Sequence, residues 1–175
     1  MKPLGSIESA SNDVLNDARK LLECLRSHLT QEPTTADEAV KTLNHIRRET
    51  YESLNQIQHE YLIIQAVKWL QKNDLTIVGG LWQWNPRQTG GKNEPDLTFM
   101  RQQICLISAE VTTSPAPKGS IGSHMQDTLS KLSQMQGNKF YFVLTEIMRK
   151  NAQTKVDASG WDINIVLIQN EKSTA

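Results

Sequence analysis

Hydrophobic residues in the first part of the chain recur at three- and four-residue steps, the spacing of one face of an α-helix. The steps run through residues 12–29 and, after a break around Pro33, through residues 35–72. Thr35 and Glu38 have the spacing of a capping box, so we expect the second helix to begin there. The first helix and the first half of the second predict a helical hairpin, with a break in the second helix near residues 53–58.

Beyond residue 73 the pattern changes from helical to extended. We predict helices over 123–135 and 146–155, and strands over 75–84 (bent at Gly79 and Gly80), 96–101, 104–113, 140–144 and 163–168. Three consecutive strands with short links predict an antiparallel meander, and the strand–helix–strand steps that follow predict parallel pairing. The fold class is therefore α/β, with an α-β-β-β-α-β core, a mixed sheet flanked by helices and an N-terminal helical hairpin.

Composition narrows the classes of partner. Nineteen Lys and Arg balance nineteen Asp and Glu, so there is no overall positive field to attract nucleic acid, and any phosphate-binding surface must be local. Cys24 and Cys105 lie far apart in apolar settings, which indicates free thiols in a reducing compartment. The first residues lack the apolar core of a signal peptide, and no apolar run has the length of a membrane span. We expect a cytoplasmic protein with no membrane partner.

Two acidic residues occupy notable places in the predicted sheet. Asp96 opens the second strand and Glu110 lies near the end of the third, so both carboxylates are expected at the same end of the sheet. Glu110 is the single acid in a largely apolar strand, which is costly unless a partner compensates for it. Two carboxylates with backbone carbonyls and water suit Mg²⁺ or Mn²⁺. The alternatives are a turn-capping role for Asp96 and an ion pair between Glu110 and a nearby Lys or Arg.

A family resemblance rests on these residues. The run Glu94-Pro95-Asp96, a short hairpin and then Ser108-Ala109-Glu110-Val111-Thr112 resembles the motif of the PD-(D/E)xK nuclease superfamily. The preceding helix, with His59-Glu60-Tyr61, is similar to that superfamily's first core helix. The resemblance covers roughly residues 58–168 and implies a restriction-endonuclease-like core over 58–175, with 1–57 as a helical extension. It also implies that Asp96, Glu110, Glu60 and the backbone carbonyl of Val111 hold the metal.

The sequence departs from the family pattern at the motif lysine, where Thr112 stands. Three explanations are open. Lys118 in the following loop or Lys131 in the following helix reaches back, with Lys118 the nearer in sequence. Alternatively, Thr112 positions water while two metals supply the charge. In the third case the site is inactive and serves only as a binding scaffold.

Several residues near the motif are candidates for contact with nucleic acid. They are Arg87 and Lys92 before Asp96, and His124 and Gln126 at the start of the following helix. For His124 a surface position is the simpler interpretation, as it is for His59. Trp82 and Trp84 share one face of their strand, which favours a place in the core or an interface over base stacking.

The function that the sequence favours is therefore divalent-metal-dependent hydrolysis of DNA phosphodiester bonds, by a restriction, repair or anti-phage defence component. Its partners would be DNA and, through residues 1–57, a second copy of the chain or a larger complex. The alternative is an inactive nuclease-like module that binds nucleic acid or a protein partner. Thr112 is the residue that favours this alternative.

Overall fold

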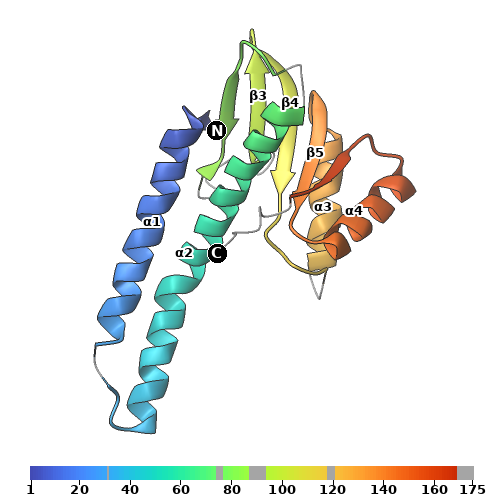
Figure 1. Cartoon of the computed structure of the whole chain (residues 1–175). Coiled ribbons are helices and arrows are strands. Elements are labelled where there is room, and N and C mark those ends of the chain that lie inside the picture. The colour runs from blue at the N-terminus through green and yellow to red at the C-terminus, as the bar shows by residue number, and fades with distance from the viewer. Residues whose placement is uncertain (31, 74–76, 87–93, 118–120, 169–175) are drawn as a thin grey trace.

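A computed structural model describes residues 1–30, 32–73, 77–86, 94–117 and 121–168 (Figure 1). The helices in this part of the chain are α1 (Ile7–His28), α2 (Ala36–Asn73), α3 (Ile121–Ser133) and α4 (Glu146–Ser159). Its strands are β1 (Lys2–Pro3), β2 (Leu81–Trp84), β3 (Leu97–Arg101), β4 (Ile104–Val111), β5 (Asn138–Val143) and β6 (Asn164–Leu167). The predicted α/β class and the order of the core elements are confirmed. Of the predicted first strand the structure describes residues 77–84, and within these Leu81–Trp84 pair, so the described strand begins later than expected.

All six strands form one sheet in the order β1-β2-β3-β4-β5-β6. Pairing is antiparallel from β1 through β4 and parallel from β4 through β6, so the predicted meander and the predicted parallel crossovers are both confirmed. Strand β1 is new, since two residues carry no periodic signal. The tight β3–β4 connection uses Gln102 and Gln103, both with positive φ.

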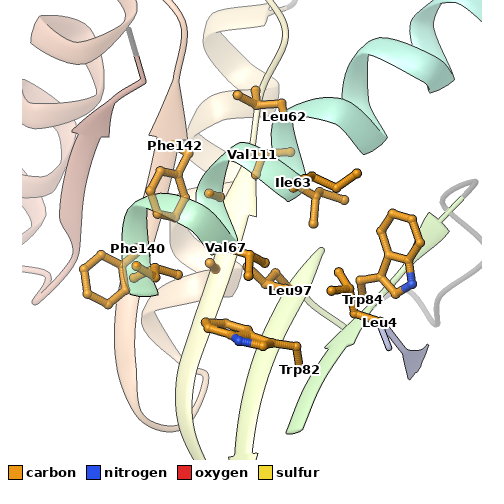
Figure 2. Close-up of a cluster of buried hydrophobic side chains, with 14 of the residues drawn as sticks. Leu4, Leu62, Ile63, Val67, Trp82, Trp84, Leu97, Val111, Phe140 and Phe142 are labelled. Atoms are coloured by element: carbon orange, nitrogen blue, oxygen red, sulfur yellow. The ribbon is translucent and has the colours of Figure 1, made fainter. Parts of the chain in front are cut away.

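Helices cover the two faces of the sheet. One face, with Phe140 and Phe142, packs beneath α2, which contributes Ile63 and Val67 (Figure 2). The alternate residues of β5 point to the other face and pack with α3 and α4. Trp82 and Trp84 are buried in the first of these layers, which confirms the interpretation of both as core residues.

The N-terminal segment contributes to the same core. Leu4, Ala10 and Val14 belong to the hydrophobic cluster beneath α2. Helix α1 begins earlier than predicted because Ser6 caps it, accepting a hydrogen bond from the Ser9 backbone N–H at 3.0 Å. The division at residue 57 stays a prediction, and it falls inside a continuous helix.

The predicted break in the second helix is wrong: α2 continues through residues 53–58. This stretch contains no proline or glycine, so the backbone has no local reason to bend. The outer part of α2 and α1 lie side by side and project beyond the sheet (Figure 1). Among the described residues, no helix is both long enough and apolar enough to cross a membrane.

Candidate active site

Strand pairing brings Asp96 and Glu110 together. Leu97 pairs with Ala109, so Asp96, one residue earlier, lies opposite Glu110 at the end of β4. Asn85 holds the start of this segment in place: its Nδ2 donates to the Pro95 carbonyl at 2.8 Å and its backbone N–H donates to the Asp96 carbonyl at 3.0 Å. The two motif carboxyls therefore lie at the same end of two neighbouring central strands, Asp96 just before β3 and Glu110 near the end of β4.

Asp96 is held by contacts from both sides. Its Oδ2 accepts a hydrogen bond from the Val111 backbone N–H at 2.9 Å and lies 3.2 Å from Nε2 of His59 on α2. Burial raises the pKa of the Asp96 carboxyl. The hydrogen bond and charge of His59, with the N–H of Val111, outweigh that effect and leave the pKa below its ordinary value. Asp96 is therefore the ionised member of the pair.

Glu110 is the more buried carboxyl and has the opposite shift. Burial and the negative charge of Asp96 raise its pKa to about 8, although Lys131 opposes the shift. Lys131 Nζ lies 2.5 Å from Glu110 Oε1 and donates to the Glu94 carbonyl at 3.3 Å. Among the described residues Oε1 has no hydrogen-bond partner of good geometry, so the lysine contact is a close approach that becomes an ion pair when Glu110 is ionised. The pair is the alternative foreseen for Glu110, and it also places a cation at the motif.

The two carboxyls line a hollow of about 450 Å³ at this end of strands β3 and β4. Other groups that line it are Val111, Thr112, Thr113, Ser114, His124, Thr128, Lys131 and Tyr141. The Thr112 hydroxyl accepts a hydrogen bond from the Ser114 backbone N–H at 3.3 Å. Glu94, which pairs with the N-terminal ammonium, lines the hollow as well, so the hollow combines three acids, one lysine and several hydroxyl groups, a set that suits a phosphate ester and a hydrated cation.

Glu60 lies away from this hollow. It is buried and lines a different one with Lys2, Asp13, Asn16, Asp17, Lys20, Trp84 and Pro86. On a helix, adjacent residues point about 100° apart, which explains why His59 reaches Asp96 and Glu60 does not. The expectation that His59 is a surface residue is wrong, because its side chain is buried against Asp96.

The remaining sequence candidates divide into three groups. Lys118, Arg87 and Lys92 lie outside the described residues. His124 lines the hollow. Gln126 does not line it and instead accepts a hydrogen bond from Lys155 at 3.3 Å. Lys131 is the described lysine that reaches the motif, and because Lys118 lies outside the described residues, the ranking of Lys118 above Lys131 stays a prediction.

Tyr141 was missed by sequence reasoning. It lies opposite Glu110 in the parallel pairing of β4 and β5, and it lines the hollow. Burial raises the pKa of its hydroxyl to about 12; a hydrogen bond with Thr112 opposes the shift, and the charges of Glu110 and Asp96 add to it. The available signal was a single hydroxyl-bearing residue within the apolar run Phe-Tyr-Phe.

Comparisons with family models, curated proteins and solved structures found no match for this chain. Among the described residues, no three His, Cys, Asp or Glu side chains converge as a ready metal site. The geometry of the site therefore carries the functional argument alone.

Proposed function

We propose that the chain is a divalent-metal-dependent nuclease with a restriction-endonuclease-like core, cleaving DNA phosphodiester bonds as a restriction, repair or defence component. The observation that carries the proposal is the arrangement at one end of strands β3 and β4, where the Asp96 and Glu110 carboxyls lie side by side and the Lys131 ammonium contacts Glu110. Lys131 contacts both segments of the motif, since it reaches Glu110 and the carbonyl of Glu94. It supplies the positive charge that Thr112 lacks.

The donor set fits Mg²⁺ or Mn²⁺. Two adjacent carboxyls offer hard ligands, and one of their buried oxygens lacks a well-aligned hydrogen-bond partner within the described ranges of the chain. Mg²⁺ commonly keeps several waters beside one or two carboxylates. Asp96 and Glu110 would hold the ion, with the Val111 carbonyl as a proposed further ligand. When bound, such an ion lowers the pKa of water and neutralises phosphate charge.

The protein's own groups have separate tasks in this proposal. His59 and the Val111 N–H hold Asp96 ionised and oriented. Glu110, whose pKa is about 8 in the metal-free protein, would give up its proton to serve as a ligand. Lys131 stabilises the charge that develops on the phosphate oxygens. Thr112 and Ser114 would position water and the substrate phosphate.

Residues 1–57 are proposed to serve assembly, with a second copy of the chain or with another protein. A second copy would supply the second active site that cleavage of both strands of a duplex requires. Arg87, Lys92, His124 and Gln126 remain proposed contacts to nucleic acid.

Plasmid nicking with Mg²⁺ or Mn²⁺ tests the proposal. We expect cleavage by the intact chain and none by Glu110→Gln, with the exposed Glu52→Gln as the matched control and circular dichroism as the check of folding. Single-stranded DNA and RNA substrates establish which nucleic acid is cut.

The alternative proposal is an inactive module that binds nucleic acid or a protein, and it rests on the absence of a lysine at Thr112. Nucleic-acid binding without Mn²⁺ uptake and without cleavage would favour it. Cleavage that survives Glu110→Gln would refute the assigned site.

A further inference from the structure

Helix α1 carries an exposed stripe in which leucines alternate with arginines. Its members are Leu15, Arg19, Leu22, Arg26 and Leu29, at steps of four, three, four and three residues. The three leucines are 45%, 52% and 73% exposed, respectively. Such spacing places all five residues along one side of the helix. An amphipathic surface helix usually buries its leucine stripe, and this one is uncovered in the single chain.

The outer part of α2 carries a second stripe of the same kind. Its members are Val40, Leu43, Arg47, Tyr51 and Leu54, at steps of three, four, four and three residues. Val40, Leu43, Tyr51 and Leu54 are 57%, 65%, 66% and 47% exposed. Here too an arginine interrupts a row of exposed hydrophobic side chains.

The two stripes lie on one face of the hairpin. On α1, Leu22 follows the half-buried Leu21, and on α2, Arg47 follows the half-buried Ile46. Leu21 and Ile46 mark the side on which the two helices meet. Each stripe lies one residue further along its own helix, so it is rotated by about 100° from that side, in the same direction when each helix is followed from its N-terminus. Because the two helices run in opposite directions side by side (Figure 1), equal turns from their facing sides lead to the same face.

The cations of this face differ from those on the rest of the hairpin in their acidic partners. Three cations elsewhere on the hairpin already have partners: Lys20 with Asp17, Lys41 with Asp37, and Arg48 with Glu49. In the part of the chain that the structure describes, Arg19, Arg26 and Arg47 have no carboxylate within ion-pair distance. The hairpin thus presents exposed leucines together with three unpaired guanidinium groups.

We propose that this face, the Leu/Arg face, binds an amphipathic helix of another protein whose apolar stripe is bordered by carboxylates. Such a helix would cover the leucines and complete a three-helix bundle, while its acids pair with Arg19, Arg26 and Arg47. A second copy of the chain fits less well. A two-fold interface sets each patch against itself, and that would place three arginines against three arginines.

The test uses the full chain and a labelled, stapled helical peptide of about three heptads, with Leu at the core positions and Glu on both borders. A sister peptide carries Lys in place of every Glu. We expect the Glu peptide to bind at least about tenfold more tightly than the Lys peptide by fluorescence anisotropy, with a preference that shrinks as salt rises. Binding is read without nuclease activity, so the test stands or fails separately from the proposed function.

Neighbouring arginines supply the matched variants. Arg47→Glu, on the Leu/Arg face, should weaken binding of the Glu peptide about tenfold or more. Arg48→Glu, turned about 100° further round α2 and already paired with Glu49, should change that binding less than about twofold. Leu22→Glu should abolish binding by both peptides. Equal binding of the two peptides, binding of neither, or equal effects of the two arginine variants would overturn the proposal. So would light scattering that shows a dimer broken by Leu22→Glu, or a DNA duplex that binds through Arg47.

Discussion

Replacing Glu110 by Gln tests the electrostatics of the site without reference to its function. In the metal-free protein the pKa of Glu110 is raised from 4.5 to about 8 by burial and by the charge of Asp96. An acid whose pKa is raised by folding keeps its proton in the folded state and loses it in the unfolded state. Between pH 4.5 and about 8, the folded protein therefore binds more protons, and its stability falls as pH rises.

The size of the effect follows from the pKa shift. Each pH unit inside that window lowers the free energy of unfolding by about 1.4 kcal/mol, or roughly 3 kcal/mol between pH 5 and pH 7. The side chain of Glu110 is 7% exposed, so solvent screens the effect little. Glutamine has a similar shape, can donate to Asp96 and cannot ionise, so Glu110→Gln should lack this contribution. The pKa of Asp96 is lowered from 3.8, so its own effect on the pH dependence of stability falls below the pH range from 4.5 to about 8 in which Glu110 acts.

The assay is urea unfolding by circular dichroism at intervals from pH 5 to pH 8, with a chelator present. Groups elsewhere titrate alike in both proteins, so the difference between wild type and Glu110→Gln isolates Glu110. We expect the variant to gain stability relative to wild type by roughly 3 kcal/mol between pH 5 and pH 7. Glu52→Gln controls for the amide substitution. Two curves that stay parallel across this range would show that Glu110 is ionised at neutral pH and that the reasoning is wrong.

Three further changes test the site and the fold. Lys131→Met should reduce cleavage about tenfold or more in the nicking assay, since it removes the cation at the motif, whereas the exposed Lys68→Met should leave it near wild type. Gly137→Ala should destabilise the fold by about 3 kcal/mol in urea unfolding, because φ is +76° and a Cβ would lie 2.4 Å from the Leu106 carbonyl carbon. Leu4→Ala should cost about 3 kcal/mol in the same assay if the N-terminal segment belongs to the core, and a loss below about 1 kcal/mol would contradict this.

The sheet was predictable because its signals are local. Alternation along β4 and short links on either side of β3 determine an antiparallel meander, and a strand–helix–strand step favours parallel pairing. Strand β1 was not predictable, because two residues such as Lys2 and Pro3 carry no period. The continuity of α2 was also underestimated, since the expected break rested on helix length rather than on a residue that bends a helix.

Only those residues of the candidate site that lie close together in the sequence could be predicted. Asp96 and Glu110 are joined by a tight hairpin, so their register follows from sequence. His59 and Lys131 come from helices on opposite faces of the sheet, and which of their neighbours points inward depends on helix rotation. A rotation of about 100° separates His59 from Glu60, and sequence alone does not determine it. Tyr141 depends on the register of a parallel pair, which is equally non-local.

Helix α2 runs without a break from the outer hairpin to the site, so its helical rotation fixes the direction of the Leu/Arg face relative to the site. Leu43 of the Leu/Arg face and His59, which contacts Asp96, both belong to this helix and lie about 24 Å apart along its axis. Insertions here are therefore not equivalent. Seven residues added to α2, with seven added to α1 opposite, lengthen the hairpin by about 10 Å and leave its face within about 20° of the original direction. Two residues added to each helix would turn the outer part of each helix by about 200° about its own axis, so the leucine stripes would lose their present direction and the sides on which the two helices meet would turn away from each other.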